Sequence, residues 1–200
     1  MVRNYCVLLM LLGLCSCAMN TPVPDDHYYK LPWQHEVLPE VRLTAGTIFV
    51  EQFIADGLYR ERALLHTVDK LGIELKQYHY HYWIDSPSRL LRDQLIRYLD
   101  ASNAAASVTA IPDASAVFGI HGTVKGFERR VYDHTDQVFV DLEFRVDNNG
   151  KDAPLLMSDY QVHVGVAGSE MNDVVIAFDT ALSQIFARFL ADLHDKLTHE

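Results

Sequence analysis

The stretch DQVFVDLEFRVDNNG, residues 136–150, decides the fold. Every second residue from Val138 to Val146 is apolar, and this period of two predicts a strand with one dry face. Polar residues stand between them over most of this run, namely Asp141, Glu143 and Arg145. The closing residues 147–150, Asp-Asn-Asn-Gly, favour a turn because Asn and Gly tolerate a positive φ. We therefore expect one long strand that turns back on a neighbour.

The same alternation continues on both sides of this stretch. Before it, one strand face is formed by Phe118, Ile120 and Val124. After it, the apolar face of a third strand is formed by Leu156, Tyr160, Val162, Val164 and Val166. Three such strands predict an antiparallel meander whose dry face needs a cover. A helix over about residues 172–197 is expected to supply it, with the apolar stripe Phe178, Leu182, Ile185, Phe189 and Leu193, widened by Phe186 and Leu190.

The first half of the chain is expected to add shorter elements. Strands are expected at 27–31, 46–54, 63–68 and 73–83, where β-branched and aromatic residues cluster. A helix is expected to begin with Ser86 as its N-cap and Pro87 in its first turn, and its apolar stripe is Leu91, Leu95, Tyr98 and Leu99. The predicted class is α+β (α/β): a mixed, largely antiparallel sheet with two amphipathic helices packed on it, in a single domain spanning residues 27–200.

The N-terminus is typical of an exported lipoprotein. Arg3 precedes a short apolar run at 7–14, which has less than half the length that a membrane-spanning helix needs. Leu14-Cys15-Ser16-Cys17 then resembles the bacterial lipobox. We expect residues 1–16 to be a signal peptide, Cys17 to carry the lipid, and residues 18–26 to form a tether. Three acyl chains on one cysteine would hold the protein at a membrane nearly irreversibly.

The net charge limits the classes of possible partner, and the positions of the cysteines limit the possible disulfides. The chain has 17 basic and 27 acidic residues, a net charge of −10; without Arg3 of the leader it has 16 against 27, or −11. Nucleic acid is a poor partner for such a surface, because its binders depend on clustered Lys and Arg. All three cysteines (Cys6, Cys15 and Cys17) fall in or next to the leader, so no disulfide is expected in the domain.

A family resemblance rests on several of these features together. They are the lipobox, the Tyr28-Tyr29-Lys30-Leu31 segment, Trp83 just before the helix at Ser86, the antiparallel strands and the closing amphipathic helix. In this order they resemble the ABC-type transport auxiliary lipoproteins of the YmbA or PqiC type, which are encoded with MCE-domain lipid transporters.

The resemblance implies a docking component that engages a periplasmic MCE assembly carrying lipid between two membranes. It implies no cofactor, and it leaves open whether the protein forms a homo-oligomer. Ala18 is permissive for transfer to the outer membrane, so the expected location is the periplasmic face of that membrane, with the inner membrane as the alternative.

Two histidines are the best candidate metal ligands. His79 and His81 are two residues apart and would project from one face of a strand. A third ligand would have to come from elsewhere, such as His66 or His163. Without a definite third ligand we predict no metal site.

Three tyrosines, Tyr78, Tyr80 and Tyr82, would fall on the opposite face of that strand. An exposed tyrosine row suits docking to a partner, because tyrosine is amphipathic and favours interfaces. Packing of these rings in the core is the alternative.

No motif predicts catalysis. Asp133–Asp136 places acid beside base, but at an expected turn, and Gly165–Ser169 lacks both the lysine of a phosphate loop and the spacing of a nucleophile elbow. We therefore predict that the chain is not an enzyme and has no catalytic residue. The alternatives to docking are a domain that binds a small envelope ligand (a glycan, a peptidoglycan fragment or a lipid) and, ranked last, a periplasmic hydrolase.

Overall fold

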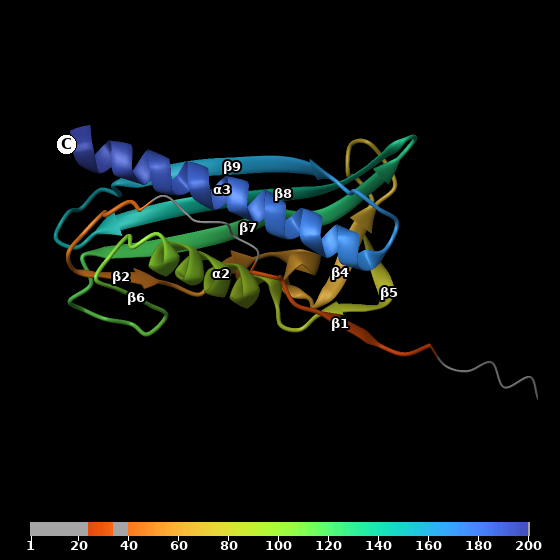
Figure 1. The fold of residues 1–200 in the computed structure, drawn as a ribbon, viewed down its shortest axis with the longest axis horizontal. Coiled ribbons are helices and arrows are strands. Elements are labelled where there is room, and N and C mark those ends of the chain that lie inside the picture. Colours follow the sequence, from red (N-terminus) through yellow and green to blue (C-terminus); the bar gives the residue numbers. More distant parts are fainter. Residues whose placement is uncertain (1–23, 34–39, 200) are drawn as a thin grey trace, which may run out of the picture.

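Three long antiparallel strands form a meander, as the alternating pattern predicts, and the last of them is an edge strand of the sheet. β7 (Phe118–Tyr132) pairs with β8 (Thr135–Asn148), and β8 pairs with β9 (Leu156–Gly165). The structure, a computed structural model, describes residues 24–33 and 40–199 (Figure 1). Cys17, the predicted signal peptide and most of the predicted tether lie outside these residues.

The other edge of β7 carries three short parallel strands in succession. β2 (Thr47–Val50), β3 (Ile54–Ala55) and β4 (Ala63–Thr67) follow β7 from its beginning to its end. β6 (Ser107–Thr109), which the sequence pattern did not predict, pairs in parallel with β2. All the described strands thus belong to one mixed sheet, and the class predicted from the sequence is confirmed.

The prediction of a single strand at 46–54 is wrong, because this segment forms two separate strands, β2 and β3. Val50 pairs with Ile120, whereas Ile54 pairs with Thr123, so one extra residue bulges between them. Phe53 lies in this bulge and its ring packs over Gly122 of β7. The aromatic residue that made the segment look like a continuous strand therefore turns inward and ends the pairing.

The sheet continues beyond β4 to an open edge. β5 (Lys76–Trp83) pairs antiparallel with β4, and β1 (His27–Tyr29) pairs in parallel with β5. β5 begins three residues later than expected, because the preceding residues form a loop that the carboxylate of Asp69 holds by accepting hydrogen bonds from backbone N–H groups. β1 is the outermost strand on this side.

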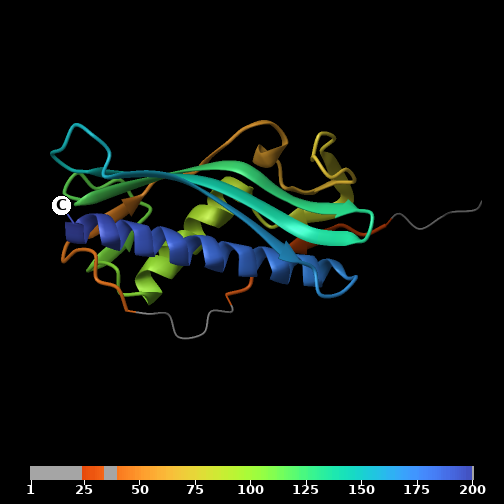
Figure 2. The same cartoon turned by 90° about the horizontal axis from the view of Figure 1, so that it is seen from above.

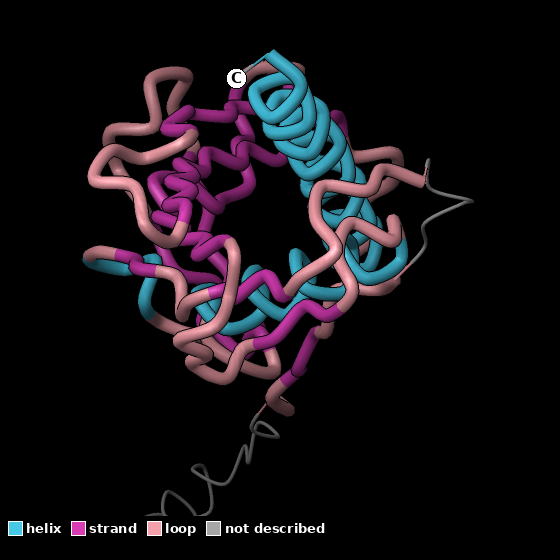
Figure 3. Tube along the Cα trace, turned by 90° about the vertical axis from the view of Figure 1, so that its left-hand side faces the viewer, coloured by secondary structure: helices cyan, strands magenta, loops and turns pink. Residues whose placement is uncertain are grey.

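Two helices cover one face of the sheet, as expected. α3 (Met171–His199) packs along β8 and β9, and α2 (Pro87–Ala101) lies beside β7 (Figure 2). Seen along the long axis, the strands curve round one side and the helices close the other (Figure 3). The predicted helix stripes are buried in the core between them. α3 is long and apolar enough to cross a bilayer, but 61% of its most apolar window is buried here, so it serves as a core helix.

Two details of the helices and strands differ from expectation. Ser86 occupies the N-cap of α2 as predicted, yet its hydroxyl makes no capping bond to the described residues, and the Asp85 carboxylate accepts the Ser86 N–H instead. The register of β7 against β8 shifts between Val124 and Gly126. This bulge turns Phe127 into the core, where a strict alternation would have placed Gly126.

The face of the sheet opposite the helices buries an ion pair. Glu128 is only 2% exposed, and its carboxylate accepts hydrogen bonds from Arg130 at 2.7 and 3.0 Å and from the Tyr59 hydroxyl at 3.0 Å. Tyr59 belongs to the short 3-10 helix η2 (Gly57–Arg60), which lies on this side of the sheet in Figure 2. Burial and the neighbouring carboxylate raise the pKa of Tyr59, so its hydroxyl stays protonated and keeps donating.

Candidate functional site

The edge formed by β1 and β5 carries the candidate site. Trp83, at the end of β5, is 1% exposed and its ring packs against Phe127 and Phe178 at centroid distances of 5.2 and 5.4 Å. The next backbone N–H, that of Ile84, donates to the Tyr29 carbonyl at 2.7 Å. A buried tryptophan thus fixes the end of β5, and β5 in turn holds β1 in register.

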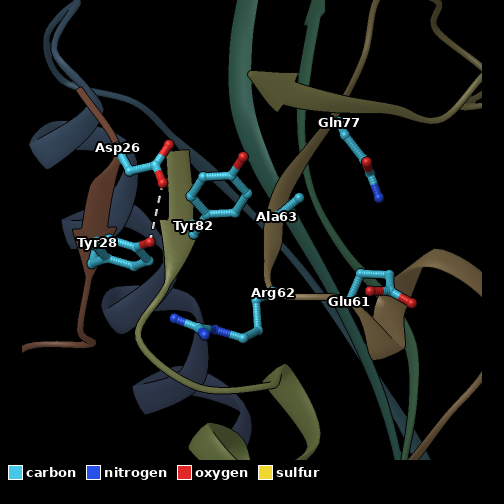
Figure 4. A pocket seen from close by; sticks show the side chains of 7 residues that line it. All are labelled: Asp26, Tyr28, Glu61, Arg62, Ala63, Gln77 and Tyr82. Carbon is cyan, nitrogen blue, oxygen red and sulfur yellow. Dashed lines mark hydrogen bonds between the residues drawn. The ribbon is translucent and has the colours of Figure 1, made fainter. Parts of the chain in front are cut away.

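One face of this edge forms a hollow of about 330 Å³ (Figure 4). The Tyr28 ring lies 5.8 Å from the Tyr82 ring, and the guanidinium carbon of Arg62 lies 5.4 Å from the centre of the Tyr28 ring. The other residues that line it are Asp26, Glu61, Ala63 and Gln77. Two tyrosine rings and an arginine present apolar surface, hydrogen-bond donors and a positive charge together.

Hydrogen bonds hold the groups of this hollow in place. The Tyr28 hydroxyl donates to Asp26 at 3.2 Å, and this bond together with the negative charge of Asp26 raises the pKa of Tyr28. Arg62 donates its Nε–H to the Trp83 carbonyl at 3.1 Å, so its guanidinium is tied to the end of β5. Asp26, which we expected on a tether, is therefore part of an organised surface.

The opposite face of the same edge carries histidines. The rings of His27 and His81 stack at 5.2 Å, and the Tyr29 hydroxyl lies 2.8 Å from Nδ1 of His81. These side chains, with Arg129 and the beginning of α3, line a second hollow of about 420 Å³. Burial and the neighbouring His27 lower the pKa of His81.

The prediction that Tyr78, Tyr80 and Tyr82 lie in a row on one face of the strand is wrong. Tyr80 has a φ of +64°, and the pairing of β4 with β5 shifts register at this point, so the alternation of side chains is interrupted. Tyr78 contacts the His81 ring edge-on at 6.0 Å and packs against the core, whereas Tyr82 contacts Tyr28 on the other face. Tyr80 is partly exposed and contacts His79. A local change in backbone conformation thus separates side chains that a regular strand would align.

Comparison with known proteins identifies the family. The family described as ABC-type transport auxiliary lipoprotein component matches residues 67–189, from the end of β4 into α3. The chain belongs to this family. The match covers more than half of the chain, and it includes β5 with Trp83, the helix α2 and the long meander. No curated protein matches the chain significantly.

Solved structures share the fold of this auxiliary lipoprotein. Protein XCC0632 from Xanthomonas campestris is 16% identical, with a TM-score of 0.74 over 85% of this chain and 95% of that one. An uncharacterized protein is 15% identical, with a TM-score of 0.69 over 84% and 99%. The hypothetical protein CT253 from Chlamydia trachomatis is 9% identical, with a TM-score of 0.52 over 78% and 99%. At these identities the likeness concerns the fold alone.

The auxiliary lipoprotein brings together few of the residues considered for metal binding or catalysis. His81 faces His27 and Tyr29, while His79 contacts Tyr80, so the two candidate ligands do not share a site. Among residues 24–33 and 40–199, no three His, Cys, Asp or Glu side chains gather closely enough to hold a metal ion. Asp133 and His134 are exposed at the β7–β8 turn, where the sequence predicts a turn. The absence of catalysis stays a prediction.

Sequence reasoning missed Tyr28 and Arg62 as site residues. Tyr28 was visible as part of an aromatic segment, but its partner Tyr82 lies 54 positions away and is reached only because β1 pairs with β5. Arg62 lies in a stretch with no distinctive pattern. The signal that could have found them is the parallel pairing, which a single sequence does not reveal.

Proposed function

We propose that this auxiliary lipoprotein docks onto the periplasmic components of an ABC-type transporter, specifically an MCE-domain assembly that moves lipid between the two membranes. Cys17 would anchor it to the periplasmic face of the outer membrane, and the inner membrane is the alternative. Membership of a transport auxiliary family supports a role through contact rather than chemistry.

One observation carries the choice of surface: the Tyr28, Tyr82 and Arg62 cluster lies at the outermost strand of the sheet. Tyrosine and arginine dominate the binding energy of protein interfaces, because they combine a large contact area with directed polar groups. The cluster is also partly exposed and already ordered by hydrogen bonds, which lowers the entropy cost of binding.

Affinity purification from detergent-solubilised envelopes tests this proposal. The full-length chain should recover an MCE-type protein, and the double variant Tyr28→Ala/Tyr82→Ala should recover at least about tenfold less, because losing hot-spot contacts typically costs 2 kcal/mol or more. Met157→Ala is the matched control, since Met157 is 62% exposed on β9, away from this cluster. Recovery of the chain alone would contradict docking, and equal recovery by the double variant would contradict this surface.

A second candidate function is favoured by the size of the same hollow. About 330 Å³ lies at the lower end of the volumes of small-molecule sites, and the lining combines aromatic rings with a few polar groups. A glycan or peptidoglycan fragment could stack on Tyr28 and Tyr82. Calorimetric titration with soluble muropeptides should then show binding by wild type and Met157→Ala that Tyr82→Ala loses; heats equal to those of dilution would dismiss this candidate.

A further inference from the structure

The loop between β4 and β5, residues 68–75, presents large apolar side chains to solvent. Leu71 is 77% exposed and Ile73 is 79% exposed, and Val68 at the beginning of the loop is 50% exposed. Such values are unusual for neighbouring aliphatic residues in one loop, because each exposed side chain forgoes the free energy that burial would contribute.

This loop is ordered by its own hydrogen bonds. The Asp69 carboxylate accepts the backbone N–H groups of Ile73 at 3.0 Å and Glu74 at 3.2 Å, and these bonds lower the pKa of Asp69. Gly72 adopts a φ of +69°, which lets the chain turn between the two apolar residues. Leu71 and Ile73 are therefore held outward by a defined turn.

The loop lies at the end of the molecule from which the N-terminal segment leaves. β1 runs parallel to β5 with His27 beside His81, so the chain before His27 leaves at the same end of the molecule as the beginning of β5, where the loop ends. β4 and β7 are also parallel, which places the β7–β8 turn at the same end (Figure 1). Nine residue-to-residue steps lead from Cys17 to Asp26, and they span at most about 32 Å when fully extended.

We propose that residues 68–75 form a membrane contact, in which Leu71 and Ile73 enter the interface of the bilayer that holds the lipid on Cys17. The inference rests on the lipid anchor of the proposed function. Lys70 stands next to Leu71, and its ammonium group can reach lipid phosphates while its methylene stem stays in apolar surroundings. The anchor confers the affinity, and this loop fixes the orientation of the domain on the surface.

A lipid occupant fits this loop better than a protein partner. Its exposed apolar side chains are all aliphatic, with Lys70 and Glu74 exposed beside them, and leucine is under-represented among the residues that dominate protein interfaces. The tyrosine and arginine side chains that suit a protein lie instead in the hollow at Tyr28 and Tyr82. The short tether already holds this end of the molecule near a bilayer, so no additional molecule has to be invoked.

Site-specific fluorescence on the lipidated full-length chain tests the membrane contact. Once Cys17 carries lipid and the leader is removed, Leu71→Cys provides a single free thiol for an environment-sensitive nitrobenzoxadiazole label. Ile111→Cys is the matched control, because Ile111 is 75% exposed and follows β6, whose partner β2 lies along the beginning of β7, at the opposite end of the sheet. Both proteins are reconstituted in vesicles of phosphatidylethanolamine and phosphatidylglycerol that contain nitroxide-labelled lipid.

The emission maximum of the label at position 71 should shift to shorter wavelength when the protein is in vesicles. Its fluorescence should be quenched at least about threefold more than that of the label at position 111, because an interfacial insertion reaches roughly 5–10 Å into the bilayer. Equal quenching at both positions in vesicles that carry the protein would overturn the membrane contact and leave the anchor intact. Protection at position 71 only in native envelopes would also overturn it, in favour of a protein partner. Failure of the protein to float with the vesicles would overturn the anchor, and the contact with it.

Discussion

Gly122 lies beneath the ring of Phe53, where a side chain has no room. A β-carbon built at this position would approach three carbons of the ring to 2.7 Å. The same ring meets Phe144 at 5.7 Å in an edge-on contact, so it cannot move away without opening the core. This single contact joins the bulge between β2 and β3 to the centre of the sheet.

Gly122→Ala should therefore lower the free energy of unfolding by about 1–3 kcal/mol, the usual cost of adding a methyl group to a packed core. Urea denaturation followed by circular dichroism measures the change. Gly165→Ala is the control: apart from its chain neighbours, no described residue has an atom within 4 Å of the added methyl group, so its effect should stay within about 0.5 kcal/mol. Adding Phe53→Leu should restore part of the loss, and an unchanged midpoint for Gly122→Ala would refute the packing argument.

The strand β1 is held partly by contacts with His81, a side chain that becomes charged when it is protonated. Its His27 ring stacks on His81, and its Tyr29 hydroxyl bonds to His81. Burial, with a smaller effect from His27, lowers the pKa of His81 in the folded state, and burial lowers that of His66 too. The unfolded or undocked chain then binds protons at a higher pH than the folded chain does, so their contribution to stability is present above the ordinary histidine pKa and is lost as pH falls.

We expect β1 to loosen as the pH falls from about 7.5 to about 5.5, through the ordinary histidine pKa of about 6.5. Hydrogen exchange of the Ile84 amide, which donates to Tyr29, reports this docking once intrinsic exchange rates are removed. Its protection should decrease more than that of the amides in β8. In His81→Gln, which keeps an acceptor but does not titrate, most of this pH dependence should disappear; an identical dependence in the variant would assign it elsewhere.

At the scale of elements, local patterns of apolar residues predicted the meander and both helices. The apolar face from Val138 to Val146 and the stripe of α3 depend only on neighbours along the chain. The parallel pairing of β2, β3 and β4 with β7 depends on residues about 60 to 70 positions away, as in the pair Ile48 and Phe118. Nothing in a short window of sequence encodes such a partner.

The described part of the molecule is a curved sheet with two helices on one face, and its N-terminal strand β1 lies near one end (Figures 1 and 3). Anchoring by Cys17 is a proposal about the entire protein, because it decides which membrane the domain serves and which end faces it. In the proposed membrane contact, orientation would follow from the parallel pairing of β1 with β5, since this pairing makes β1 begin toward the end of the molecule where the β4–β5 loop lies.

Metabolic labelling with a palmitate analogue checks the anchor. Wild type should be labelled and recovered in the membrane fraction, whereas Cys17→Ser should lose both properties, because only the lipobox cysteine is a substrate for acylation. Cys15→Ser is the matched control, since Cys15 is two residues away and fits the motif poorly. Equal labelling of Cys17→Ser and wild type would refute the anchor.

By itself the sequence determined the class of the fold, the long strands, the two helices and the family resemblance, because periodicity and turn residues act locally. Only the tertiary structure decided which side chains meet at the edge formed by β1 and β5. The positive φ of Tyr80 divides the predicted tyrosine row, and the pairing of β1 with β5 brings Tyr28 to Tyr82 and His27 to His81. Backbone hydrogen bonds between segments distant in the chain impose these neighbours, and such bonds carry almost no sequence signature because every residue except proline can make them.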